Sequence, residues 1–124
     1  MAQQIKINKM NIEILNNELN SLALKGDMIT AVTNYFAEQS TTKDHTGTVI
    51  SSKAEHLKKM EAFLGGIAKV NGITLHKVAI ADNVSFNEFT FDFDMKYTSK
   101  ILWHEVIRRI WADNKVIEEQ YFIA

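Results

Sequence analysis

Residues 108–124 read RRIWADNKVIEEQYFIA, and this stretch decides the fold class that we expect. Asp113 and Asn114 are turn residues that stand between two runs rich in β-branched and aromatic side chains. The pattern predicts a hairpin in which the strands continue on both sides of the turn, with Arg108 opposite Glu119. Because side chains alternate along a strand, this register also predicts which residues share a face.

The runs that precede this hairpin have the same character. Residues 73–81, 84–95 and 100–111 are rich in β-branched and aromatic residues, and short turn-forming segments separate them. Together with residues 115–123, they predict a meander of four antiparallel strands.

The first half of the chain predicts helices instead. Apolar residues recur at spacings of three and four over residues 10–24, which is typical of an amphipathic helix. Gly26 is expected to end this helix, and Asp27 to cap a second, short one. Ser52 begins a third helix with a capping-box signature, and helical spacing continues to about residue 69. Helices followed by a meander predict an α+β fold, with the helices packed on one face of an antiparallel sheet.

Composition narrows the class of protein. With 124 residues the chain is long enough for one domain over residues 1–124 with a core of its own. Its 14 Lys and Arg against 15 Asp and Glu leave no basic excess for nucleic acid or an anionic membrane. The absence of cysteine excludes disulfides and thiolate chemistry, and no segment reaches membrane-spanning length. We therefore expect a cytoplasmic protein without nucleic-acid or membrane partners.

Both faces of the last hairpin mix large apolar groups with charges. By the predicted register, one face carries His104, Val106, Arg108, Glu119 and Tyr121. The other face carries Trp103, Ile107, Trp111 and Phe122, interleaved with the charged residues Glu105, Arg109 and Glu118. A sheet with one solvated face alternates more cleanly. We therefore expect the helices and a cavity to cover the first face, and a second copy of the chain to cover the other as a homodimer.

The order of these elements is recognisable. The chain begins with a helix, the pair GD and a short helix. It continues with a loop that reads DHTG at residues 44–47, a capped helix and a meander that ends in RRIWADNKVIEEQYF. This order resembles the nuclear-transport-factor-2-like superfamily in its SnoaL-like branch, over nearly the whole chain. The resemblance implies a cone-like roll, in which a strongly curved sheet wraps around the helices and leaves a pocket open at one end. Members include ketosteroid isomerase, polyketide cyclases and non-catalytic binding modules, so the fold alone does not decide the function.

The resemblance also implies candidate site residues. Asp44 matches the base in the ketosteroid isomerase loop, although the proline of that loop is missing here. The oxyanion hole of that enzyme is not matched, because its tyrosine falls near Leu19 and its neutral aspartic acid falls on Val106. His104 is the second candidate for acid or base chemistry. The implied pocket wall holds Phe89, Phe91, Phe93, Val106, Arg108, Glu119 and Tyr121, which predicts a small apolar ligand.

Each of these residues also has a structural interpretation. Asp44 can be a solvated turn residue, His104 a hydrogen-bonded histidine, and Arg108 with Glu119 an ion pair. Two functions therefore stay open. One is a cofactor-independent isomerase, cyclase or dehydratase that acts by proton transfer on a small apolar carbonyl compound. The other is a non-catalytic ligand-binding or dimerisation module of the same fold. Neither requires a cofactor, and the histidines make no metal-ligand spacing.

Overall fold

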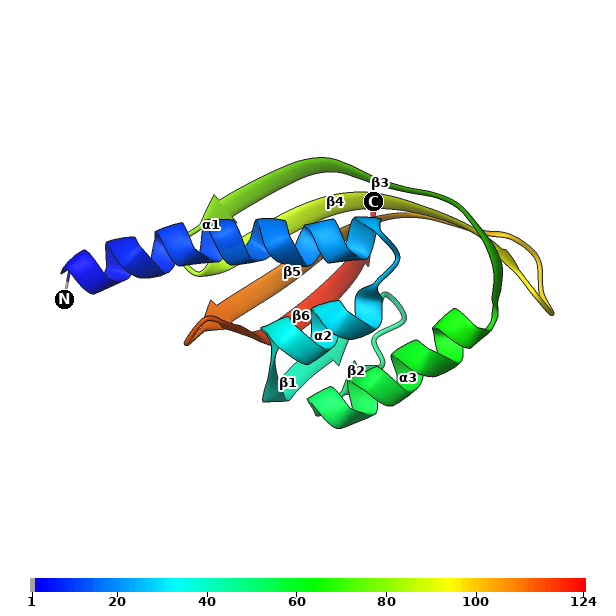
Figure 1. Ribbon diagram of the computed structural model, residues 1–124, viewed down its shortest axis with the longest axis horizontal. Helices are drawn as coiled ribbons and strands as arrows, with labels where there is room; N and C mark the ends of the chain where they lie inside the picture. Colours follow the sequence, from blue (N-terminus) through cyan, green and yellow to red (C-terminus); the bar gives the residue numbers. More distant parts are fainter. Residues whose placement is uncertain (1) are drawn as a thin grey trace.

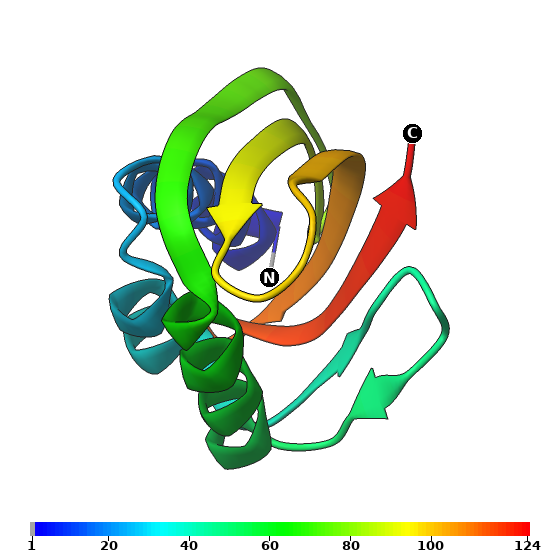
Figure 2. The same cartoon turned by 90° about the vertical axis from the view of Figure 1, so that its right-hand side faces the viewer.

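The computed structural model describes residues 2–124, with side chains from residue 11 onward. Its helices are α1 (Ala2–Leu24), α2 (Met28–Tyr35) and α3 (Lys53–Gly65). Its strands are β1 (Phe36–Lys43), β2 (Val49–Ile50), β3 (Ile67–Ala81), β4 (Val84–Met95), β5 (Ile101–Ala112) and β6 (Lys115–Ile123). Figure 1 shows α1 lying along the sheet, and Figure 2 shows the sheet curling around this helix. The predicted α+β, cone-like fold is confirmed.

The sheet has the strand order β2-β1-β6-β5-β4-β3. Strands β3 to β6 form the predicted antiparallel meander. The polar segment after α2 adds β1, which pairs with β6 in parallel, so the complete sheet is mixed. A parallel pair needs a long crossover between its strands, and α3 with the rest of the meander supplies it. Among the described residues, no helix is long and apolar enough to cross a membrane.

Local signals end α1 and begin α2 and α3 at the predicted residues. Gly26 follows α1 with φ of +79°, a left-handed conformation that glycine adopts without strain. The side chain of Asp27 then accepts a hydrogen bond from the backbone N–H of Thr30 at 3.3 Å, which caps α2. Ser52 caps α3 in the same way, accepting from the backbone N–H of Glu55 at 3.2 Å.

The predicted end of α3 near residue 69 is wrong. The helix ends at Gly65, Gly66 is its C-cap, and β3 begins at Ile67. Two adjacent glycines weaken a helix by about 1 kcal/mol each relative to alanine. From Ile67 onward the backbone instead pairs with β4, beginning at Met95. Strand pairing therefore takes over where helix propensity is lowest.

The last hairpin contains a β-bulge that the sequence pattern does not predict. Asp113 and Asn114 have φ of +50° and +63°, which is the conformation of the predicted tight turn. Next to the turn, Trp111 pairs with Val116. One residue further from the turn, Ile110 pairs with Glu118 and not with Ile117. Ile117 is thus one extra residue on β6, and such a residue reverses the alternation of side chains.

The bulge shifts the pairing across the hairpin by one residue. The predicted pair of Arg108 with Glu119 is wrong, because Arg109 lies opposite Glu119. In the same register Ile107 lies opposite Tyr121. Glu119 and Tyr121 therefore share the concave face with the odd-numbered residues of β5, not with the even-numbered ones.

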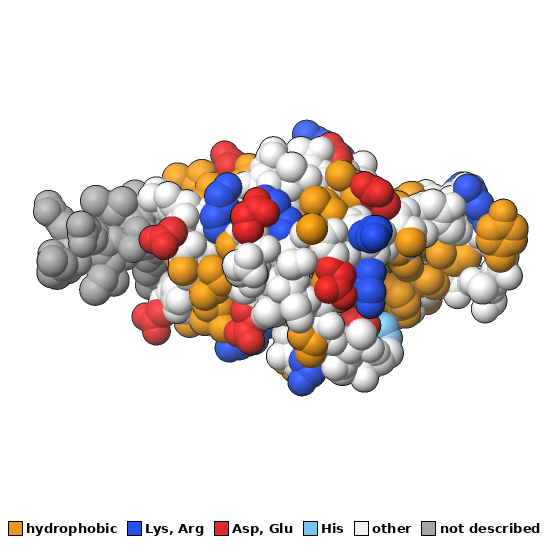
Figure 3. All heavy atoms as spheres, turned by 90° about the horizontal axis from the view of Figure 1, so that it is seen from below, with side chains coloured by type: hydrophobic (Ala, Val, Ile, Leu, Met, Phe, Trp, Pro, Cys, Tyr) orange, Lys and Arg blue, Asp and Glu red, His pale blue; other side chains and the backbone are white. Residues whose placement is uncertain are grey.

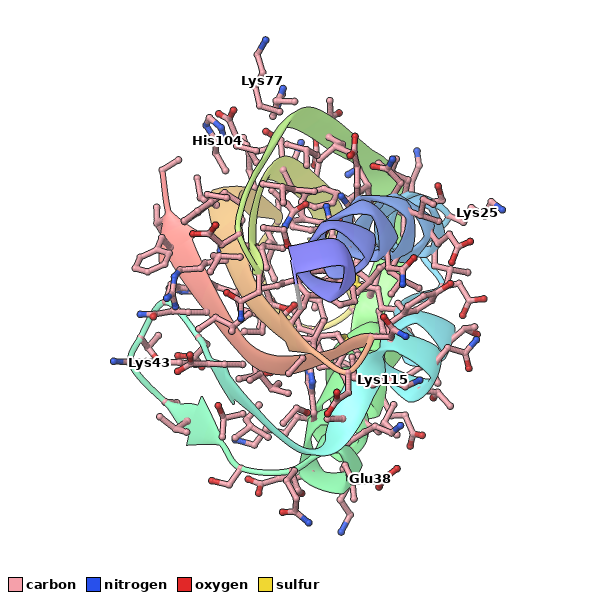
Figure 4. The ribbon with its side chains drawn as sticks, turned by 90° about the vertical axis from the view of Figure 1, so that its left-hand side faces the viewer. Lys25, Glu38, Lys43, Lys77, His104 and Lys115 are labelled. Atoms are coloured by element: carbon pink, nitrogen blue, oxygen red, sulfur yellow. The ribbon has the colours of Figure 1, made fainter. Side chains whose placement is uncertain are left out.

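Consequently the predicted faces of β5 are inverted. His104, Val106 and Arg108 do not face the cavity, and Figure 4 shows His104 at the outer surface, pointing away from α1. Three of the four predicted dimer-interface residues lie on the concave side instead: Trp103 lines a cavity, and Ile107 and Trp111 are 4% and 1% exposed. Phe122 alone is on the outer face, where it is 43% exposed.

Candidate functional site

A cavity of about 240 Å³ lies between the concave face of the sheet, α3 and the loop after β1. We call it the main cavity. Most of its wall is apolar: Met28, Ile50, Met60, Phe63, Phe91, Phe93 and Trp103. The rings of Phe63 and Trp103 are stacked, with centroids 5.7 Å apart and planes tilted by 16°. Figure 3 shows hydrophobic side chains gathering at the end of the molecule that carries the β4–β5 hairpin. This wall suits a flat, apolar ligand.

Glu105 is the most buried carboxyl group in this wall. It lies on the concave side of β5, opposite Phe89 of β4, and is 5% exposed. Burial disfavours its charged form, and the nearby carboxylate of Glu119 adds to the effect. Together they raise the pKa of Glu105 from 4.5 to about 7. At neutral pH both protonation states are populated, so this group is able to accept or donate a proton.

His45 stands beside Glu105 at the rim of the main cavity. Its Nδ1 lies 3.8 Å from Oε2 of Glu105, and its ring packs edge-on against Trp103 with centroids 5.3 Å apart. The side chain is 29% exposed, so it connects the buried carboxyl group with solvent. The pair places a carboxyl group and an imidazole ring at one point of an apolar wall.

Asp44 lies next to His45 but is held in a turn. Its Oδ1 accepts hydrogen bonds from the hydroxyl of Thr46 at 2.6 Å and from the backbone N–H groups of Thr46 and Thr48 at 2.9 and 3.0 Å. The bond from the Thr46 hydroxyl is the main cause that lowers the pKa of Asp44 below its ordinary value. A base that works at neutral pH requires a raised pKa, so Asp44 does not meet that requirement although it lines the cavity.

A buried polar network lies behind the cavity. Arg109 and Glu119 are each 2% exposed, and Nε of Arg109 lies 3.3 Å from Oε2 of Glu119. Nη1 of the same arginine donates to the side-chain oxygens of Asn16 and Asn20 at 3.1 and 2.8 Å. Both asparagines in turn donate to Oδ1 of Asn87 at 2.8 and 2.9 Å. The network ties α1 to three strands and fixes the position of Glu119.

On its other side this network reaches a buried histidine on α3. Oγ1 of Thr42 lies 3.4 Å from Nδ1 of His56 and 3.5 Å from Oε1 of Glu119. His56 is 4% exposed, and burial lowers its pKa, which the charge of Glu119 partly opposes. His56 is therefore neutral at neutral pH. Tyr121 also stays neutral, because burial and the charge of Glu119 raise its pKa well above 10.

The candidate residues from the sequence are divided between the two faces of the sheet. Phe89, Phe91 and Phe93 are buried on the concave side, and Glu119 and Tyr121 join them. His104 and Arg108 lie on the outer face beside glutamates. Nε2 of His104 is within hydrogen-bond distance of Oε2 of Glu88, at 2.6 Å, and Nη1 of Arg108 is 3.9 Å from Oε2 of Glu118. Because both lie on the wrong side of the sheet, neither reaches the cavity.

Sequence reasoning missed Glu105, Arg109, His45 and His56 as site residues. The first two were assigned to the outer face by the register that the bulge corrects. A usable signal existed, because the odd-numbered face of β5 carries both tryptophans, whose large apolar rings favour the interior. Among the described residues, no group of three or more His, Asp or Glu side chains is arranged to hold a metal ion.

Several solved structures share this architecture. A protein described as a SnoaL-like polyketide cyclase, from Mesorhizobium loti, superposes with a TM-score of 0.81 at 19% identity, covering 90% of this chain and 97% of its own. A protein of Catenulispora acidiphila with a ketosteroid isomerase-like fold, in complex with trimethylamine, gives 0.70 at 15% identity, covering 83% and 80%. An LEH-like epoxide hydrolase of M. tuberculosis gives 0.71 at 10% identity, covering 92% and 82%.

By sequence, no protein-family model and no curated protein matches this chain. The structural matches define its class: an α+β cone whose curved sheet encloses helices and an apolar cavity. More narrowly, the fold is that of the SnoaL-like proteins in the nuclear-transport-factor-2-like superfamily. Because that fold carries several activities, the function has to be argued from the site.

Proposed function

We propose that this protein is a cofactor-independent enzyme that transfers a proton on a small apolar carbonyl compound. The observation that carries the proposal is Glu105, a carboxyl group with a pKa of about 7, buried in an aromatic wall beside His45. Perturbed acids in apolar cavities are common in catalytic sites. Fold relatives described as polyketide cyclases support the same reaction class.

In the proposed step, the carboxylate of Glu105 removes a proton from the carbon next to the carbonyl group. The electrons of that C–H bond form a carbon–carbon double bond, and the carbonyl π electrons move to oxygen. His45 stands 3.8 Å from Glu105 and is the donor for that oxygen. Return of the proton to the same carbon gives exchange, and return to a conjugated carbon gives isomerisation. The surrounding apolar side chains strengthen these interactions because they exclude water.

Deuterium exchange tests this proposal without knowledge of the natural substrate. Propiophenone, a flat ketone with two exchangeable α-hydrogens, is incubated in D₂O with the protein, and loss of the α-hydrogen signal is followed by NMR. The active form of Glu105 is the carboxylate, so the protein-dependent rate should rise with pH through about 7 and then level off. Binding of propiophenone without any protein-dependent exchange would contradict the enzyme and favour a non-catalytic binding module.

We also propose that the outer face of the sheet forms a two-fold homodimer, with a different set of residues from the predicted one. Phe86, Leu102 and Phe122 are 38%, 63% and 43% exposed on this face, beside the ion pair of Arg108 with Glu118. Exposed apolar groups next to an arginine are typical of interface centres. Sedimentation at micromolar concentration should give a dimer that Leu102→Glu converts to a monomer. A monomer mass for the wild type would contradict the dimer.

A further inference from the structure

A second, smaller cavity lies deeper in the cone. Its volume is about 40 Å³, and we call it the inner chamber. Small apolar side chains of α1 and α2 form one side of it, among them Ala23 and Ala31, which are 7% and 4% exposed. Phe89 and Ile107 of the sheet form the opposite side, and the buried pair of Arg109 with Glu119 also borders the chamber. The inner chamber has room for a short chemical group but not for an aromatic ring.

The inner chamber and the main cavity share part of their walls. Met28 of α2, Met60 of α3, Phe91 of β4 and Tyr121 of β6 line both. These four side chains therefore stand between the two spaces, and we call them the neck. Methionine side chains are unbranched and have three rotatable bonds, so two of the four neck residues adjust their shape at low energetic cost.

Glu105 lies on the outer side of this neck. It lines the main cavity together with Phe63, Phe93 and Trp103. Ala23, Ala31, Phe89 and Ile107 line the inner chamber but not the main cavity. A ketone with its carbonyl carbon near Glu105 and its flat part against the aromatic rings has two directions for a substituent, toward the open rim at His45 and toward the neck, and only the neck leads to the inner chamber.

We propose that the two cavities form one ligand site, which takes a flat apolar ketone whose slim, unbranched alkyl tail passes the neck and fills the inner chamber. This inference rests on the proposed function, because it assumes that the carbonyl group lies beside Glu105. It adds a determinant of specificity: the length and branching of the tail. The neck and the inner chamber select the tail, whereas the stacked rings of the main cavity bind the flat part.

Phenyl n-alkyl ketones from acetophenone to hexanophenone test the role of tail length. Their dissociation constants are measured by calorimetry with the full chain. Each added methylene that is buried should tighten binding by about fourfold until the inner chamber is full. Ala23→Leu fills the chamber, so this variant should bind acetophenone as the wild type does but lose the gain from longer tails. Ala62→Leu, at an exposed position of α3 outside both cavities, is the matched control.

Valerophenone and its isomer isovalerophenone test branching, because they have the same atoms and differ only in the end of the tail. The wild type should bind the straight isomer about tenfold more tightly, as expected for one misplaced methyl group in a fitted site. Met28→Ala widens the neck and should reduce this preference to less than threefold. Ala31→Val, a second variant that narrows the inner chamber, repeats the length test if Ala23→Leu does not fold.

The outcomes separate this inference from the proposed function. Glu105→Gln keeps both cavities, so it should retain the preference for long, straight tails even though it loses exchange. The inference would be overturned if all tails bound with equal affinity, or if the variants that fill the chamber kept the preference for long tails. In either case, exchange by the wild type would still support the proposed enzyme. Failure of every ketone to bind would overturn both.

Discussion

Replacing Glu105 by Gln is expected to lower the rate of α-hydrogen exchange in propiophenone by about 10²–10⁴-fold, the contribution of a positioned acid or base. Glutamine has nearly the same shape as glutamic acid but does not titrate, so the cavity keeps its form and loses its proton acceptor. Because Glu105 is 5% exposed and has a pKa of about 7, its carboxylate is a stronger base than an exposed one. The variant should also lose the rise of rate with pH.

Three variants are controls for this result. Glu118→Gln changes the same side chain at a position that is half exposed on the outer face and should leave the exchange rate within twofold. Asp44→Asn and His104→Gln replace the two bases considered from the sequence. The first holds a turn and the second is paired with Glu88 on the outer face, so effects of only a fewfold are expected. If either of these abolished exchange and Glu105→Gln did not, Glu105 would not be the base.

Replacing Arg109 by Met is expected to lower the free energy of unfolding by about 3–5 kcal/mol, the typical cost of breaking a buried ion pair from one side. Methionine keeps much of the volume but leaves the carboxylate of Glu119 buried at 2% exposure without its cation. It also removes the donor to the side-chain oxygens of Asn16 and Asn20. Natural domains have total stabilities of only about 5–15 kcal/mol, so the loss is severe. Urea denaturation followed by circular dichroism measures it.

The neighbouring arginine provides the matched control. Arg108 lies on the outer face, where its contact with Glu118 is 3.9 Å long and partly exposed, so Arg108→Met should cost less than about 1 kcal/mol. A double variant, Arg109→Met with Glu119→Gln, should recover part of the loss because no unpaired charge remains buried. A cost below 1 kcal/mol for Arg109→Met would mean that the buried pair adds nothing to stability. Equal costs at the two arginines would contradict the assignment of faces.

Local chemistry determined much of the fold. Gly26 and Asp27 end and begin helices because one adopts a left-handed backbone and the other offers a capping oxygen, and both effects act within a few residues. Asp113 and Asn114 form the tight turn for a similar reason. Alternation of Phe89, Phe91 and Phe93 with polar residues directs these rings to one face, whatever else the chain does. These features needed no knowledge of the remaining structure.

The composition of the site was decided by tertiary structure. In β5 and β6, Trp111, Val116, Glu119 and Tyr121 all lie on the concave side. Val116 and Glu119 are three positions apart, so regular alternation would place them on opposite faces. They share a face only because Ile117 bulges out of the strand between them. No residue type in that segment signals a bulge, since it arises from competition between the turn and the packing of both strands. The pKa of Glu105 has the same origin: the sequence contains an ordinary glutamate, and only burial beside Glu119 raises its pKa to about 7. Turns and caps depend on neighbours in the chain, whereas register and proton affinity depend on neighbours in space.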